Sequence, residues 1–208
     1  MKTKSLFIIV ILIFFWGCEE KSTVPKYESN KITKLISFAK ELNTKFELTA
    51  ETIPFFELAL ELNPKNYLAN GNLGTIYLKS QNFSKALHYL TKAVVIRPDD
   101  IELNLNIGHA YFAVDQYEKS LEFLEKGAQL IQSRIQKFLL MPQTELKNLS
   151  EKLALAYAVG GVAADQIGDG KKSISNTQKA YKKFLSLKDF KNANFAKKKL
   201  NEFKIKYK

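Results

Sequence analysis

The chain has 208 residues, 46% of them hydrophobic and 25% charged, with a single cysteine and a formal net charge of +11. This length allows one domain with a sizeable core, and a lone thiol excludes a disulfide framework within the chain. The basic balance is local, because residues 171–208 contain thirteen lysines, no arginine and two acids. That segment lacks the combined pattern of arginines and stacking aromatics that base recognition favours, so we expect no nucleic-acid partner.

The chain begins with a short apolar segment. Two lysines precede eleven consecutive apolar residues from Leu6 to Trp16, which are followed by Gly17 and Cys18. Eleven residues in a helix span about 16 Å, well short of the roughly 30 Å hydrocarbon core of a bilayer. We therefore expect an export signal. With cysteine directly after a small residue, the segment resembles the signal of bacterial lipoproteins, although Phe15 and Trp16 depart from the usual residues before the cysteine.

That resemblance implies cleavage before Cys18 and lipidation of this cysteine. It divides the chain into a signal peptide over 1–17, a lipidated cysteine with a polar linker over 18–31, and a helical domain over 32–208. It also implies a lipid anchor in the inner or outer membrane of a bacterial cell envelope, on the periplasmic or surface side. Several acyl chains on one cysteine hold a protein more stably than a single chain does. Two alternatives stay open: an uncleaved signal anchor, and a secretory signal in which the cysteine is incidental.

An internal repeat follows. The stretches NLGTIYLKSQNFSKAL (72–87) and NIGHAYFAVDQYEKSL (106–121) match at a spacing of 34 residues, with Gly74 and Gly108 at equivalent places. A period of this length over two short amphipathic helices is typical of a helical solenoid. Glycine inside a helix costs about 1 kcal/mol relative to alanine. We expect close approach of the paired helices to offset that cost.

The repeat resembles the tetratricopeptide repeat, with Asn70 in place of the opening tryptophan and with matches at Leu73, Gly74, Tyr77, Ala86, Ala93 and Pro98. The resemblance implies an all-α fold, an α-α superhelix of about four helical hairpins over 33–66, 67–100, 101–134 and 154–187, closed by a capping helix over 189–207. The third of these units lacks the closing proline, so its second helix is expected to continue to Pro142. In the capping helix we expect an inner side formed by Phe195, Leu200 and Phe203.

In this family the first helices of successive repeats line a concave groove, which receives an extended peptide or a helix of a partner. Here the resemblance places in that groove Asn72, Thr75, Leu78, Leu105, Asn106, His109, Phe112 and Asp165. This lining is mostly apolar, so the clamp with which some members grip a carboxylate is not reproduced. The alternative for residues such as Leu105 and Phe112 is packing beneath a neighbouring helix.

These patterns favour a membrane-anchored adaptor that binds a protein or peptide in the envelope. The alternative is a protein whose lysine-rich end contacts acidic lipid or cell-wall polymer, with contacts from Lys197, Lys198 and Lys199. The two histidines lie in different repeats, and the sequence contains no metal-binding cluster, phosphate loop or nucleophile motif. We therefore expect no enzymatic activity, no metal and no cofactor.

Overall fold

The computed structural model describes residues 34, 37, 50–138 and 140–208. Over this part of the chain the regular structure is entirely helical: a short 3-10 helix, Ala50–Thr52, leads into eight α-helices. These are α3 (Ile53–Leu62), α4 (Tyr67–Lys79), α5 (Phe83–Ile96), α6 (Ile101–Ala113), α7 (Tyr117–Lys137), α8 (Gln143–Gln166), α9 (Gly170–Ser186) and α10 (Phe190–Lys206). The predicted all-α fold is confirmed. The signal peptide, Cys18, the linker and most of the first repeat unit lie outside the described residues.

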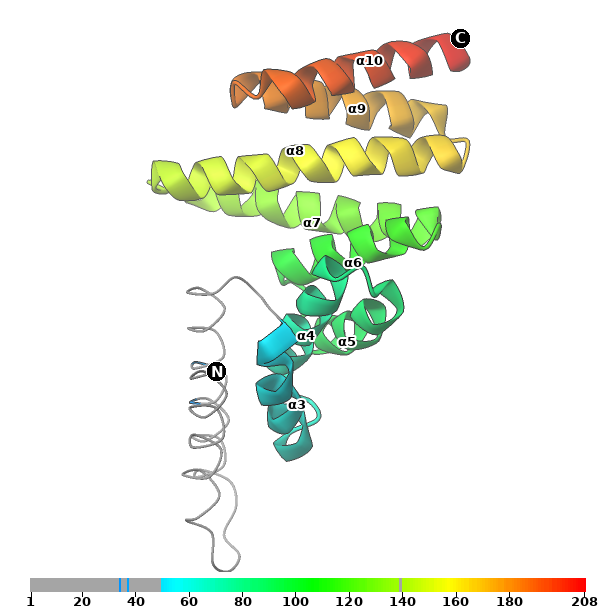
Figure 1. Ribbon diagram of the computed structural model, residues 1–208. Helices are drawn as coiled ribbons and strands as arrows, with labels where there is room; N and C mark the ends of the chain where they lie inside the picture. The colour runs from blue at the N-terminus through cyan, green and yellow to red at the C-terminus, as the bar shows by residue number, and fades with distance from the viewer. Residues whose placement is uncertain (1–33, 35–36, 38–49, 139) are drawn as a thin grey trace, which may run out of the picture.

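The helices stack in chain order, from α3 at one end to α10 at the other (Figure 1). Each helix packs against the next, and the first helices of successive hairpins also meet, α4 with α6 and α6 with α8. Buried apolar side chains form four clusters that follow the stack instead of converging on one centre. A core distributed in this way is the property of a solenoid, in which each repeat contacts its neighbours.

One close contact recurs in three hairpins and accounts for the repeated glycine. A Cβ atom built on this glycine would lie 2.4, 2.7 and 2.3 Å from the nearest side-chain atom of a residue sixteen positions further along the chain. Because no real Cβ fits at such distances, only glycine lets the two helices of each hairpin approach. The pairs are Gly74 with Leu90, Gly108 with Leu124, and Gly161 with Thr177.

The turn between hairpins is fixed by a buried asparagine. Asn104 is fully buried, and its Nδ2 donates to the carbonyl oxygens of Pro98 at 2.8 Å and Asp100 at 2.7 Å. Asn70 makes the equivalent pair of hydrogen bonds one repeat earlier, to the carbonyls of Pro64 and Asn66. The residue that replaces the family's tryptophan therefore satisfies backbone acceptors that the turn would otherwise bury unpaired.

The insertion before the last hairpin is helical. Helix α7 continues beyond the repeat unit, as expected, but it ends at Lys137 and not at Pro142, and α8 already begins at Gln143, eleven residues before the predicted unit. The added turns of α7 and α8 pack on one another through Ile131, Leu149 and Leu153, so the insertion lengthens a hairpin instead of forming a loop.

The predicted inner side of the capping helix needs one correction. Phe195 is 56% exposed, whereas Leu200 and Phe203 are buried as expected. The remaining inner positions are Ala193 and Ala196, which lie in one cluster with residues of α8 and α9. Small side chains allow α10 to lie close to α9, and the larger aromatic ring is therefore left on the solvent side.

Candidate binding face

Two contacts between first helices define one face of the stack. Asn106 Nδ2 on α6 donates a 3.0 Å hydrogen bond to Thr75 Oγ1 on α4. Toward α8, Lys152 Nζ donates to the carboxylate of Glu102. Glu102 and Asn106 are one turn apart on α6, so both contacts lie on the same side of that helix. We call the face marked by these four residues the inner face.

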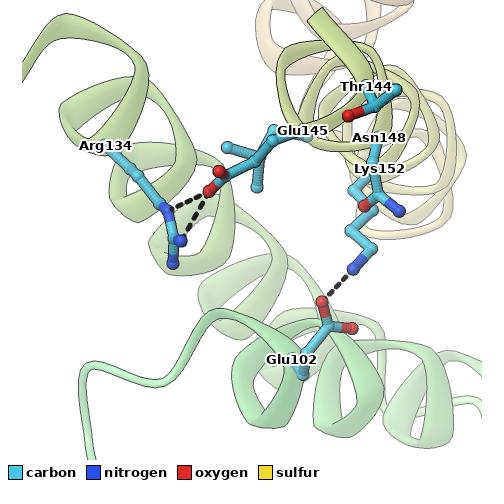
Figure 2. A pocket seen from close by; sticks show the side chains of 7 residues that line it. Glu102, Arg134, Thr144, Glu145, Asn148 and Lys152 are labelled. Atoms are coloured by element: carbon cyan, nitrogen blue, oxygen red, sulfur yellow. Dashed lines mark hydrogen bonds and ion pairs between the residues drawn. The ribbon is translucent and has the colours of Figure 1, made fainter. Parts of the chain in front are cut away.

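A hollow of about 420 Å³ opens on this face at the start of α6 (Figure 2). It exists because the lengthened α7 and α8 extend beyond α6 and leave space between the three helices. Figure 2 shows Arg134 of α7 pointing toward Glu145 of α8, with 2.6 Å between Nη2 and Oε1. The hollow is lined by Glu102, Arg134, Thr144, Glu145, Asn148, Leu149 and Lys152.

The chemistry of the hollow is polar and balanced in charge. Its two acids and two bases form the pairs Arg134–Glu145 and Lys152–Glu102, all four of whose side chains remain at least 32% exposed. Exposed ion pairs of this kind contribute little to stability and can exchange partners. The side chains of Thr144 and Asn148 make no hydrogen bond within the described residues. These groups can accept and donate hydrogen bonds to a polypeptide backbone.

Four predicted groove residues lie at or near the inner face. Thr75 and Asn106 are brought together across two repeats, as described above. Asn72 is half-buried and donates from Nδ2 to the carbonyl of Leu68 at 2.8 Å, while Leu78 packs against the first apolar cluster. Thr75 and Asn106 therefore lie on the inner face, whereas Asn72 and Leu78 lie near it and contact residues of the stack itself.

Three predicted groove residues are engaged elsewhere. Leu105 is only 4% exposed, because its side chain packs against the small residue Gly127. Phe112 lies edge-on to Tyr117, with 5.6 Å between ring centroids, and packs against the cluster that α7 and α8 form with Leu121, Ala163 and Ala164. Both side chains therefore pack against neighbouring helices, with Leu105 buried and Phe112 half-buried. Asp165 Oδ1 accepts from Lys206 Nζ at 2.8 Å and from Tyr207 Oη at 3.0 Å, so the end of α10 occupies this carboxylate.

His109 lies one turn beyond Asn106 on α6. Its ring is half-buried, and its Nε2 is buried without a hydrogen-bond partner. Burial lowers the pKa of the imidazole from its ordinary value of 6.5, because a charged ring is poorly solvated there. The histidine is thus held neutral near pH 7.

The predicted lysines of α10 separate into two groups. Lys197 and Lys198 are exposed, whereas Lys199 Nζ donates to Glu202 at 2.8 Å and is half-buried. Only the first two are free of an ion pair within the described residues.

Sequence reasoning missed the hollow because it depends on the length of the insertion. Arg134 and Glu145 lie in what the repeat pattern treats as extra residues between two units. A signal was present in Leu146, Leu149 and Leu153, whose three- and four-residue spacing predicts a helix before residue 154. No spacing rule would have shown which charged residues of that helix face α6 and α7.

Other chemistry is scarce in the described residues. They contain no group of three or more histidine, cysteine, aspartate or glutamate side chains arranged to hold a metal ion. In the same part of the chain, none of the helices has the length and apolar character needed to cross a membrane.

Comparisons with known proteins support the helical-repeat fold. Models of the tetratricopeptide repeat match residues 55–88 and 101–133. A search of curated proteins finds no match. Among solved structures, MamA is 20% identical with a TM-score of 0.58, covering 86% of this chain and 97% of MamA. The pilF protein of Pseudomonas aeruginosa is 11% identical with a TM-score of 0.54, covering 86% of this chain and 78% of pilF.

A third structure, PilW, a type IV pilus biogenesis factor, is 16% identical with a TM-score of 0.52, covering 86% of this chain and 79% of PilW. At these identities the likeness shows the fold alone. The two family matches fall on the hairpins that share the glycine contact and the buried asparagine. This chain is therefore a tetratricopeptide-repeat protein.

Proposed function

We propose that the protein is a scaffold that binds a segment of another protein on its inner face. The observation that carries this proposal is the continuity of that face: α4, α6 and α8 are joined by Asn106–Thr75 and Lys152–Glu102, and a polar hollow opens between α6, α7 and α8. A rigid surface with balanced charges and spare hydrogen-bonding groups suits a peptide segment. Nothing in its chemistry supports catalysis, so we infer a non-enzymatic role.

We further propose that the scaffold is tethered to a bacterial membrane through lipidated Cys18. The apolar segment from Leu6 to Trp16 followed by Gly17 supports this proposal. One similar structure, PilW, is described as a type IV pilus biogenesis factor. A role in assembling an envelope structure would suit a tethered scaffold of the same fold.

The tether is tested by metabolic labelling with radioactive palmitate. Because Cys18 is the only cysteine, Cys18→Ser should abolish labelling. An unlabelled wild-type chain would reject the tether, and it would leave the binding proposal to its own test.

The binding face is tested by site-specific photo-crosslinking in intact cells. A photoreactive residue at Asn72 or at the exposed Leu155 of α8 should capture the same partner, because both positions belong to first helices. Matched controls at the exposed positions Lys92 and Gln178, on second helices, should capture none. The inner-face crosslink should weaken with Lys152→Glu, which adds a third carboxylate to the hollow and sets it against Glu102. Equal capture from the control positions would overturn the assignment.

A further inference from the structure

The solvent side of α10 has an ordered pattern that scaffolding by the inner face does not use. At 100° per residue, a central strip of uncharged residues runs along this side, with lysines on both of its edges. All eight side chains are exposed, and Figure 1 shows α10 at the edge of the stack. We call this side the outer face of α10. Its strip is Phe190, Asn194, Asn201 and Ile205, and its edges are Lys191 with Lys198 and Lys197 with Lys204.

The strip exposes two large apolar side chains that take no part in packing α10 against α9. Phe190 is 63% exposed and Ile205 is 74% exposed, at opposite ends of the helix. The opposite side of α10 already supplies the packing against α9, through the buried residues Ala193, Ala196, Leu200 and Phe203. The outer face therefore presents large apolar side chains to whatever lies beyond the stack.

The lysines of this face are not neutralised by the protein. Within the described residues none of the four forms an ion pair. The nearby acids are occupied: Asp189 caps α10, Glu202 pairs with Lys199, and Asp165 pairs with Lys206. A second copy of this face would bring four more positive charges, so self-association here is electrostatically unfavourable. The charge is complementary to an anionic occupant.

A lipid surface satisfies both parts of the pattern. Lysine side chains at the edges of a helix can extend their ammonium groups to headgroups while their stems and the apolar strip lie deeper. A purely polar polyanion would pair with the lysines but leave Phe190 and Ile205 in water. We propose that the outer face of α10 lies on an anionic lipid surface, with Phe190 and Ile205 in the interfacial region and the four lysines against acidic headgroups. This contact is independent of partner binding on the inner face.

The test places a fluorescent probe on the face itself. In the full chain carrying Cys18→Ser, an environment-sensitive dye is attached at Asn194→Cys, so that the signal reports α10 and not the apolar N-terminal segment. Vesicles of phosphatidylcholine mixed with phosphatidylglycerol should shift the emission to the blue, and vesicles of phosphatidylcholine alone should not. Added salt should reverse the shift, since exposed charges are screened within about 10 Å at 0.1 M.

Two sets of variants distinguish this face from general basicity. Changing Lys191, Lys197, Lys198 and Lys204 to Gln should weaken the vesicle response at least about tenfold. The control changes four exposed lysines elsewhere to Gln, at Lys65, Lys79, Lys92 and Lys137, and should keep the response. The double variant Phe190→Ser with Ile205→Ser should reduce the blue shift while circular dichroism stays helical.

Three outcomes would overturn the proposal: no shift on anionic vesicles, an equal loss in the control variant, or no loss in the double variant. A blue shift with an acidic polypeptide such as polyglutamate, but none with anionic vesicles, would reassign the face to an acidic protein partner.

Discussion

At the scale of single residues, the two adjacent glycines of α8 serve different purposes. A Cβ on Gly161 would lie 2.3 Å from Thr177 Oγ1 and 3.2 Å from the backbone nitrogen of that residue. A Cβ on Gly160 would meet Asn176 at 3.4 Å and Leu121 at 3.5 Å, which are ordinary contacts. Gly161 is therefore the crossing glycine of the third hairpin, and Gly160 is not.

This difference predicts opposite effects for neighbouring alanine substitutions. Gly161→Ala should destabilise the protein by about 1–3 kcal/mol, because the added methyl group forces α8 and α9 apart. Gly160→Ala should stabilise it by up to about 1 kcal/mol, since alanine is favoured over glycine in a helix and fits here. Urea unfolding followed by circular dichroism measures both. Destabilisation of equal size by the two variants would contradict the assignment.

A second residue-scale prediction concerns His109 and pH. Burial lowers the pKa of this histidine in the folded state, whereas in the unfolded chain it returns to about 6.5. Below that value the unfolded state binds more protons than the folded state, so stability falls as the pH drops. Above it the two states are equally unprotonated at this site and its contribution no longer changes with pH.

The measurement compares the wild type with His109→Asn, which removes the titrating ring. Between pH 7 and pH 5 the urea midpoint of the wild type should fall more steeply than that of the variant. His88, the other histidine, is exposed on α5, so His88→Asn serves as the control and should retain the wild-type slope. Parallel curves for the wild type and His109→Asn would show that burial of the ring is not what limits stability in acid.

At the scale of elements, the sequence predicted helix identity well and helix length poorly. The 34-residue period located α4, α5, α6 and the start of α7, because glycine and alanine recur wherever two helices cross. It failed at α8, whose first eleven residues belong to no repeat. The prediction for Phe195 was also wrong. This large apolar residue was expected to face the core, but Ala193 and Ala196 pack there instead.

The sequence accordingly predicted the residues of the inner face only in part. Positions counted from the repeat predicted one shared side for Thr75 and Asn106, and their side chains meet in the structure, since both lie in units that keep the period. The same counting placed Leu105 in a groove. In the structure its side chain is buried in the core, because Gly127 leaves room for it. The contact between Arg134 and Glu145 could not be predicted from repeat positions, because the lengths of α7 and α8 determine where these two side chains meet.

The junction between α9 and α10 gives an element-scale prediction. A Cβ on Gly170 would lie 2.3 Å from the ring of Tyr207, whose hydroxyl also hydrogen-bonds to Asp165. Gly170→Ala should therefore displace the ring and loosen the end of α10. In a Tyr207→Ala background the same substitution should cost little, because the clash is gone. A double-mutant cycle from urea unfolding should thus be strongly non-additive, and simple additivity would contradict the contact.

At the scale of the whole molecule, the distributed core determines how far the effect of a destabilising substitution extends along the stack. Four apolar clusters succeed one another from α3 to α10, and each repeat is stabilised by its neighbours. In a closed globule, loss of one large core residue lowers the stability of every helix together. In an open stack the loss should remain near the site of the change, since distant repeats share no contacts with it.

Phe203→Ala tests this property at the α10 end. The side chain is 4% exposed, and its loss should cost about 3 kcal/mol locally. Amide hydrogen exchange should accelerate throughout α10 and in the part of α9 beneath it, while α4, α5 and α6 keep their wild-type protection. Phe190→Ala on the same helix removes an exposed ring of equal size and should change exchange little. Faster exchange in α4 after Phe203→Ala would mean that the molecule unfolds as one cooperative unit, because only a shared core could carry the effect across the five intervening helices.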